Sequence, residues 1–318
     1  MIKSPHFMRH LLAVLFLFAL AARCQATADE LAEARSLLDA GKVEEAESIL
    51  RPYLLQNPES ADAHFLLGYA LFRDEKPKES LAEFTAGAKF RRPRADELKI
   101  VAADYVMLAD YSDADKWFTQ VITETPDDAD AWYLLGRTKY NENEYPAAIT
   151  SLERALALHP RYVEAENNIG LAWKELNNHD KAQAAFQTAI EWQGGTPSDA
   201  QPFLNLGALL AESGQNDKAI VYLTKAAALS PRNPAVHEEL GKVYLAMNKL
   251  PDAQAELEQA IALSPDTSAL HYKLGQILHK EGMQERAQQE FDLVEKLNGT
   301  HSSSKTPNPP PAEKPQPR

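Results

Sequence analysis

Apolar residues along this chain fall in pairs of short stretches, each with the three-to-four-residue spacing of an amphipathic helix. The clearest pair lies between Pro126 and Pro160. Its first half carries Trp132, Leu135 and Gly136, and its second half carries Ala148, Leu152 and Ala155. Because neither half can bury its apolar stripe alone, the pattern predicts two helices packed against each other.

A proline closes each such pair, and successive closing prolines are 33 to 37 residues apart. They are Pro58, Pro93, Pro126, Pro160, Pro197, Pro231 and Pro265. Gly136 and Ala148 have counterparts in most repeats, and small side chains at these two places let paired helices approach closely. The period predicts eight helix-pair units, which are residues 27–60, 61–94, 95–128, 129–162, 163–199, 200–233, 234–267 and 268–301.

This order of residues resembles the tetratricopeptide repeat, whose signature is W-x2-L-G-x2-Y, then A-x3-F, then P. The resemblance covers residues 27–301. It implies an all-α fold, namely a right-handed superhelical solenoid of antiparallel helix pairs with a repeat of 34 residues. It also implies that the first helices of successive units line a concave groove.

The first 28 residues have the composition of a secretory signal peptide. The apolar run at residues 11–22 is too short to span a bilayer, and residues 26–28 form an A-x-A cleavage site. We therefore expect residues 1–28 to be removed and the protein to be exported, with a bacterial periplasm or cell envelope as its location. The alternatives are a lipid anchor on Cys24 and an uncleaved N-terminal anchor.

The end of the chain has a different composition from the repeats. Gly299 stands where the next closing proline is due, and residues 302–318 contain six prolines and no apolar anchor. This composition predicts a disordered tail with polyproline character. It also predicts that no polar capping helix follows the eighth unit.

Charge and cysteine content narrow the functional classes. The formal net charge is −13, which disfavours nucleic acid as a partner. Cys24 is the single cysteine, so the repeats hold no disulfide or thiolate metal site. No H-E-x-x-H, glycine-rich phosphate loop or nucleophile elbow is present. We expect a non-catalytic protein with no cofactor and no metal and, after signal cleavage, no membrane span.

Two groups of polar residues have a structural interpretation. Three histidines occupy the unit position of Trp132 and are expected to be half-buried spacers; they are His64, His237 and His271. A basic run ends the second helix of the second unit, where cations complement the helix dipole. The basic run consists of Lys89, Arg91, Arg92 and Arg94. Docking of an acidic segment or a phosphate group is the alternative for this run.

The best candidates for partner binding are set by the expected groove. In the family, unit positions 2, 5, 6, 9, 12 and 13 tend to face it. The second unit places Phe65, Tyr69, Phe72 and Arg73 on this face, and the fourth unit places Tyr133, Arg137, Tyr140 and Asn141 there. Aromatic side chains beside guanidinium groups are typical anchors for a partner chain.

The fifth and sixth units offer amides instead. Their candidates are Asn167, Asn168, Lys174 and Asn205. Asn168 and Asn205 share unit position 6 and are expected to be neighbours along the groove. Because an amide both donates and accepts, such a pair can hold a peptide backbone. This resembles the asparagine ladders in the repeats of O-linked N-acetylglucosamine transferases and kinesin light chains.

These features predict a protein–protein interaction scaffold or adaptor that binds an extended peptide or a helix of another protein in its groove, in cell-envelope assembly or secretion. One alternative is a self-assembling scaffold in which the uncapped eighth unit forms a homodimer. The other is an accessory subunit of an envelope enzyme complex.

Overall fold

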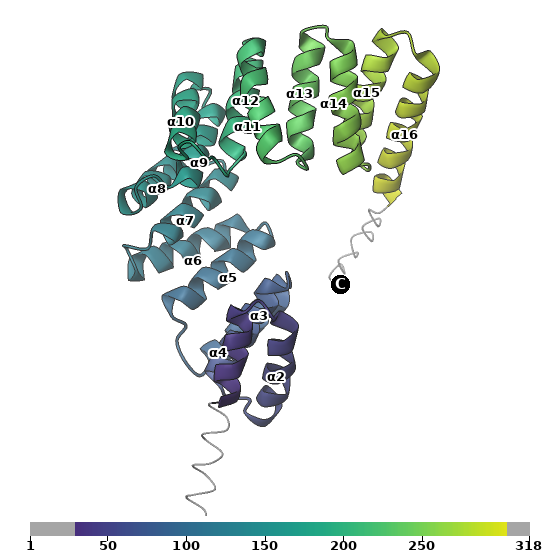
Figure 1. Cartoon of the computed structure of the whole chain (residues 1–318). Helices are drawn as coiled ribbons and strands as arrows, with labels where there is room; N and C mark the ends of the chain where they lie inside the picture. Colours follow the sequence, from purple (N-terminus) through teal and green to yellow (C-terminus); the bar gives the residue numbers. More distant parts are fainter. Residues whose placement is uncertain (1–28, 304–318) are drawn as a thin grey trace, which may run out of the picture. The chain divides into compact units, whose positions relative to one another are not determined.

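The computed structural model describes residues 29–303. The predicted signal peptide, with Cys24, and the predicted tail from residue 304 onward lie outside the described residues. The described chain divides after Pro160 into an N-terminal unit and a C-terminal unit. Every regular element within residues 29–303 is a helix, so the fold is all-α as predicted (Figure 1).

The described part of the N-terminal unit consists of helix pairs. The first pair is a helix at residues 29–39 with α2 (Val43–Gln56). The following pairs are α3 (Ala61–Arg73) with α4 (Pro77–Ala88), α5 (Ala95–Met107) with α6 (Tyr111–Glu124), and α7 (Ala129–Asn141) with α8 (Tyr145–Leu158).

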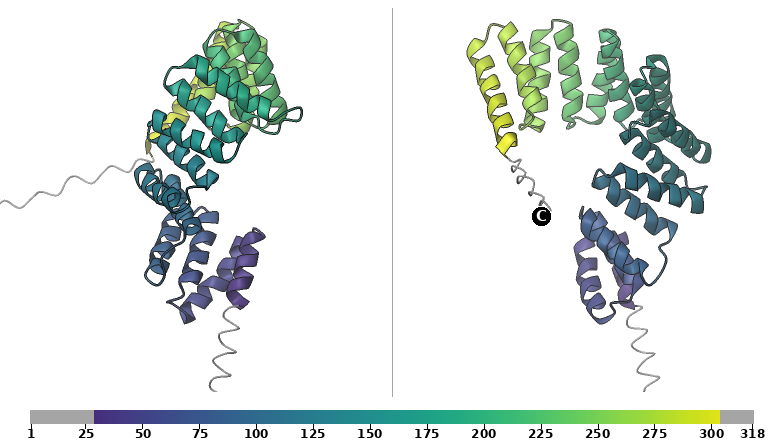
Figure 2. Two further views of the ribbon diagram at one scale, coloured as in Figure 1. Left: turned by 90° about the vertical axis from the view of Figure 1, so that its left-hand side faces the viewer. Right: turned by 180° about the vertical axis from the view of Figure 1, so that it is seen from behind.

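The C-terminal unit is built in the same way, and Figure 2 shows the paired helices of each unit from two further sides. Its pairs are α9 (Val163–Glu175) with α10 (His179–Trp192), α11 (Gln201–Glu212) with α12 (Asn216–Leu229), α13 (Pro234–Ala246) with α14 (Leu250–Leu263), and α15 (Ser268–Lys280) with α16 (Gln284–Ser303).

The end of α16 differs from the predicted end of the repeats. The helix continues to Ser303, so the limit set at residue 301 and the first two residues of the predicted tail fall inside it. Earlier helix pairs end at a closing proline, whereas the first proline after Pro265 is Pro307. Without a proline, nothing in the sequence stops the helix at residue 301.

Local sequence explains where several helices begin. The side chains of Ser60, Asp128 and Asn233 accept hydrogen bonds from backbone N–H groups in the first turns of α3, α7 and α13. Proline occupies the first turn of α4, α8 and α14, where its missing N–H leaves no hydrogen bond unmade.

Glycine allows the two helices of a pair to touch. A Cβ added at Gly170 of α9 would lie 2.5 Å from the ring of Phe186 on α10, which is fully buried. In α7, a Cβ at Gly136 would lie 2.6 Å from Leu152 of α8. The large side chain of the second helix therefore fills the space that the glycine leaves open. The recurring glycine and large residue thus follow a packing rule, in which a side chain at the glycine position would collide with the second helix.

Gly170→Ala tests this rule. Alanine is the better helix former by about 1 kcal/mol, but its Cβ would overlap the Phe186 ring, and overpacking of a core costs about 1–3 kcal/mol. We expect a net loss of stability, measured by urea unfolding. Gly195→Ala is the control, because a Cβ there meets nothing within 4 Å. Equal stability of the two variants would contradict the rule.

A buried polar pair joins three helices of the N-terminal unit. Ser80 of α4 stands where every other repeat has alanine, and Asp104 of α5 is fully buried. The Ser80 hydroxyl lies 2.8 Å from the carbonyl oxygen of Gly68 in α3 and 2.6 Å from Oδ2 of Asp104. The other carboxyl oxygen of Asp104 is buried with no hydrogen-bond partner among the described residues.

The protonation state of Asp104 decides whether this pair is satisfied. Burial raises the pKa of Asp104 to about 7, against a smaller opposing effect of its hydrogen bond with Ser80. One hydroxyl proton cannot be donated to both oxygens that face Ser80. When Asp104 is protonated, it can donate to Ser80 while Ser80 donates to Gly68. When it is ionised, one of these bonds is lost and a charge is buried.

Stability is therefore expected to fall as the pH rises from about 4 to 8. The pKa of Asp104 is higher in the folded chain than its ordinary value of 3.8, so the folded state binds a proton that the unfolded state has released. The stability that protonated Asp104 contributes is complete below the pKa of this carboxyl in the unfolded chain. It is lost as the pH rises through the pKa of Asp104 in the folded chain. The loss is on the order of 4 kcal/mol.

Urea unfolding at pH 5 and pH 8 measures this effect. The variant Ser80→Ala with Asp104→Ala removes both polar groups, with alanine as the residue of every other repeat at the Ser80 position and of two repeats, Ala70 and Ala172, at the Asp104 position. Its unfolding should depend less steeply on pH. An identical pH dependence in the variant and the native chain would rule out Asp104 as the titrating group.

Candidate functional site

A pocket of about 350 Å³ lies on the first helices of the N-terminal unit. It is lined by Arg35, Asp62, Phe65, Leu66, Tyr69, Arg94, Asp96, Glu97 and Ile100. These residues belong to the helix at 29–39, to α3, and to α5 with the residue before it. The aromatic and aliphatic side chains make it apolar inside, and the charged side chains lie around them.

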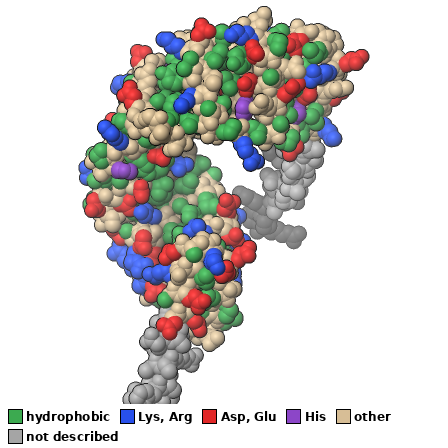
Figure 3. All heavy atoms as spheres, viewed as in Figure 1, with side chains coloured by type: hydrophobic (Ala, Val, Ile, Leu, Met, Phe, Trp, Pro, Cys, Tyr) green, Lys and Arg blue, Asp and Glu red, His purple; other side chains and the backbone are tan. Residues whose placement is uncertain are grey.

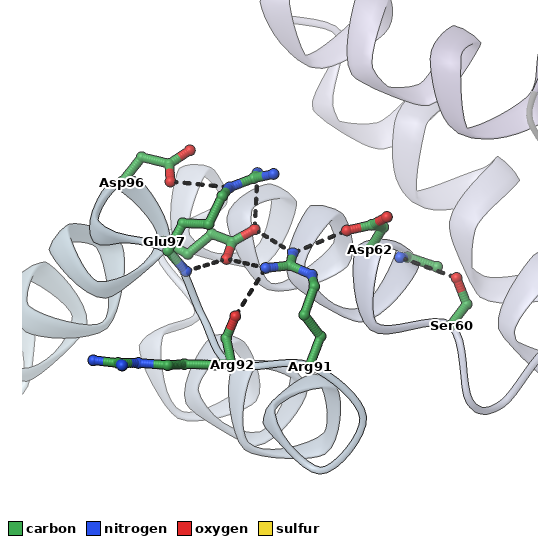
Figure 4. A network of polar contacts seen from close by, with 8 residues as sticks. Ser60, Asp62, Arg91, Arg92, Asp96 and Glu97 are labelled. Carbon is green, nitrogen blue, oxygen red and sulfur yellow. Dashed lines mark hydrogen bonds and ion pairs between the residues drawn. The ribbon is translucent and has the colours of Figure 1, made fainter.

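One buried carboxylate organises the wall of this pocket. Glu97 of α5 is 6% exposed and accepts two hydrogen bonds from Arg91, at 2.7 and 3.1 Å (Figure 4). It also accepts from the backbone N–H of Arg94 at 2.7 Å, which caps α5. Arg91 reaches Asp62 of α3 at 2.9 Å and lies 4.5 Å from the centre of the Phe65 ring. This pocket network therefore ties α3 to α5.

The basic run is used differently from the prediction. It was expected to complement the dipole of the second helix, but α4 ends at Ala88, before the run begins. Arg91 and Arg94 pair with carboxylates of α3 and α5, and Arg92 pairs with Glu124 at 2.5 Å. The partners of Arg91, Arg92 and Arg94 are thus carboxylates of α3, α5 and α6 and not the carbonyls of α4.

Phe65 is a core residue, which corrects its assignment to the groove surface. It is 3% exposed, and its ring stacks on Phe84 of α4 with 5.7 Å between ring centres. It forms the inner part of the pocket. The ring turns toward the second helix of its own repeat because it packs against Phe84, whereas Tyr272 at the same unit position of the last repeat is exposed.

The other three candidates on α3 lie together at the pocket. Tyr69 lines it and stacks with Phe72 at 6.5 Å, and both rings are half-buried. Arg73 is exposed and donates a hydrogen bond to the Tyr69 hydroxyl at 3.1 Å. The structure thus brings Tyr69, Phe72 and Arg73 into one surface next to the pocket.

The candidates on α7 form a second group in the N-terminal unit. The Arg137 guanidinium lies 5.7 Å from the centre of the half-buried Tyr133 ring. Tyr140 is half-buried and contacts Tyr145 of α8 edge-on at 5.5 Å, so it partly packs within its own repeat. Asn141 is exposed at the last residue of α7.

The amides of the C-terminal unit are joined in a different pair from the predicted one. Asn205 of α11 donates to Asn167 of α9 at 2.9 Å and accepts from Gln201 at 3.0 Å. Asn168 bonds the carbonyl of Glu164 in its own helix at 2.7 Å. Asn167, one position before Asn168, therefore contributes the amide that bonds Asn205 across to α11. Lys174 pairs with Glu212 of α11 at 2.7 Å.

The three histidines have a role that the sequence analysis missed. Nε2 of His237 lies 3.0 Å from the carbonyl oxygen of Pro231, and Nδ1 lies 2.7 Å from Glu256 of α14. His64 and His271 make the same two contacts with the closing proline and with a glutamate nineteen residues later. Each histidine therefore fastens the loop before its repeat to the second helix of that repeat.

A signal in the sequence could have revealed this contact. Glutamate follows nineteen residues after each of the three histidines, as Glu83, Glu256 and Glu290. Trp132 occupies the same position and donates through Nε1 to the Pro126 carbonyl at 3.0 Å, but its indole has no second nitrogen, and Ser151 stands where the glutamate would be.

His237→Phe is expected to destabilise the chain by about 1–3 kcal/mol, because it removes the ring nitrogens that contact the Pro231 carbonyl and the Glu256 carboxylate. His237→Trp with Glu256→Ser copies the arrangement at Trp132 and should recover much of the loss. Thermal unfolding of the three proteins measures the effect. A phenylalanine variant as stable as the native chain would show that the histidine is only a spacer.

Charged side chains of both signs are interspersed on the surface of each unit (Figure 3). On the face seen in Figure 3, Lys and Arg side chains lie among Asp and Glu side chains on both units. Within residues 29–303, no helix has the length and apolar character needed to cross a membrane. No three His, Cys, Asp or Glu side chains of the described chain are grouped so that they could hold a metal ion.

Comparisons with known proteins agree on the repeat. One model of the tetratricopeptide repeat matches residues 31–95, 102–163, 134–194 and 174–234, and a second matches residues 210–277. Protein O-mannosyl-transferase TMTC1 of Mus musculus is 24% identical over 157 residues, which are 48% of this chain and 16% of that protein. The chain spans less than a quarter of the length of the curated relatives it matches.

Two solved structures are similar over much of the chain. A tetratricopeptide repeat protein from Parabacteroides merdae is 19% identical, with a TM-score of 0.66, over 80% of this chain and 99% of that one. PilW, a type IV pilus biogenesis factor, is 21% identical, with a TM-score of 0.58, over 66% of this chain and 95% of that one. At these identities the similarity establishes the fold.

Proposed function

The chain belongs to the tetratricopeptide repeat family, and from that premise we propose that it is a non-catalytic scaffold that binds a segment of another protein along the first helices of its repeats. The observation that carries this proposal is the pocket on α3 and α5. It is apolar inside, has a volume within the range of ligand sites, and has a wall held by the pocket network.

The surface next to the pocket suits a polypeptide partner. Tyr69 and Phe72 are half-buried, so they offer ring surface with little freedom left to lose on binding. Arg73 lies beside them with its guanidinium exposed. Aromatic and arginine side chains grouped in this way are typical of the residues that dominate protein–protein affinity.

The amide chain of the C-terminal unit is a second contact region in this proposal. An amide group has two N–H donors, and Asn205 uses one of them for Asn167. Its bonds to Gln201 and Asn167 fix the orientation of the side chain. A fixed donor of this kind suits the backbone carbonyl of an extended segment.

We also propose export to a bacterial periplasm or cell envelope and a part in envelope assembly or secretion. The support is the signal-like composition of residues 1–28. The fold of PilW, a pilus biogenesis factor, is compatible with such a role. An accessory subunit of an envelope enzyme would use the same binding surface.

Self-assembly through the last repeat has weaker support. At unit position 28 the first seven repeats have an apolar residue, for example Ile190, Ala227 and Ile261. Ile261 of α14 packs against the α15–α16 pair. The eighth repeat has Glu295 at this position, and its side chain is exposed. A charged residue where repeats meet is typical of a terminal repeat with a polar outer face, which does not favour pairing with a second copy.

Site-specific photocrosslinking in the native host tests the proposal. A benzoylphenylalanine in place of Tyr69 should crosslink to a different protein, because the side chain lies at the pocket. The same residue in place of Leu55 of α2, which is 86% exposed, should give no such product. Equal capture at both positions, or products that contain only a second copy of this chain, would refute the proposed function.

A further inference from the structure

The charges at the pocket are unequally satisfied. Each carboxylate of the lining already faces a guanidinium: Asp62 pairs with Arg91, Asp96 with Arg94, and Glu97 with both arginines. Two arginines at the same surface have no carboxylate partner among the described residues, and both are exposed. They are Arg35, which lines the pocket, and Arg73, which bonds the hydroxyl of the lining residue Tyr69.

This arrangement selects the charge of a ligand. A cationic ligand would have to compete with guanidinium groups for carboxylates that are already paired. A carboxylate would meet guanidinium donors that currently face water, and arginine binds carboxylates through two parallel hydrogen bonds. The unpaired guanidinium groups at the pocket therefore favour a ligand that carries negative charge.

The interior of the pocket selects a bulky apolar group. Phe65, Leu66 and Ile100 line it, and the Phe65 ring contacts both Phe84 and the Arg91 guanidinium. A rigid apolar cavity gains most from a side chain that is itself large and stiff, such as an aromatic ring. A small anion alone would leave this surface in contact with water.

We propose that the pocket is the docking site for an extended segment of a partner protein in which a large apolar side chain is flanked by acidic residues. The apolar side chain enters the pocket, and the flanking carboxylates pair with Arg35 and Arg73. This inference rests on the proposed function and specifies its ligand. The net charge of −13 repels such a segment at long range, so recognition depends on the short-range contacts with these two arginines.

The probe for this proposal is a fluorescein-labelled glycine–serine peptide that contains Asp-Trp-Glu. Two matched peptides contain Lys-Trp-Lys, which reverses the charge, and Asp-Gly-Glu, which removes the apolar group. Fluorescence polarisation with the full chain should show binding of the Asp-Trp-Glu peptide at least about tenfold tighter than of either matched peptide.

Charge reversal of the protein provides the second arm. Arg35→Glu with Arg73→Glu should lose affinity for the Asp-Trp-Glu peptide by about tenfold or more and gain affinity for the Lys-Trp-Lys peptide. Arg154→Glu of α8 is the control, because it changes the net charge in the same direction at an exposed residue outside the pocket lining and should leave binding unchanged. Circular dichroism verifies that all variants fold.

Several outcomes would overturn the proposal. They are equal binding of the two tryptophan peptides, no binding of any peptide in the millimolar range, and equal effects of the Arg154 control and the double variant. If crosslinking at Tyr69 still captures another protein in any of these cases, the proposed function stands and the composition proposed for the segment is wrong. If it does not, both fail together.

Discussion

Six of the eight repeats depend on two helices that touch where a glycine of the first meets a large side chain of the second, and Ala34 and Ala102 take the place of the glycine in the first and third repeats. At Gly170 and Phe186 the distance is so short that no other residue fits without displacement. The glycine is a poor helix former, and the helix that contains it is stabilised by the partner it allows to approach. Tertiary packing, more than local propensity, is thus what stabilises these helices.

The repeat also explains which features the sequence could predict. Helix pairs, their order and their buried stripes come from residues that recur with the period, so every copy supports the same interpretation. The functional surface comes from residues that do not recur, and there the sequence was less informative. Phe65 was expected at the groove surface and forms the buried inner part of the pocket, while the amide that bonds to Asn205 is that of Asn167. A shift of one position on a helix turns a side chain by about 100°, and the family pattern does not specify position that finely.

The hydrogen bonds and ion pairs that polar side chains make with other repeats were the least predictable feature of the structure. Nothing close in sequence to Arg91 indicates that Asp62, twenty-nine residues earlier, is its partner. The histidine contacts were different in kind, because a glutamate at a constant separation accompanies each histidine. Correlated differences between repeats of one chain therefore carry structural information that the shared residues lack. The polar side chains that depart from the repeat, among them Ser80, Asp104 and the pocket network, lie mainly between α3, α4 and α5. The same helices carry the pocket.

Glu295 has a consequence for how this protein could change in length during evolution. Solenoid genes grow by tandem duplication, and each new repeat must bury the last face of the repeat before it. A copy of the α13–α14 pair inserted ahead of α15 would pack against Ile261 of the original α14. The α15–α16 pair would then pack against the corresponding isoleucine of the copy. A copy added after α16 would instead cover Glu295 and strip water from its carboxylate, at a cost of several kcal/mol. Duplication within the array therefore places apolar residues against each other, whereas a repeat packed on α16 would have to bury the carboxylate of Glu295.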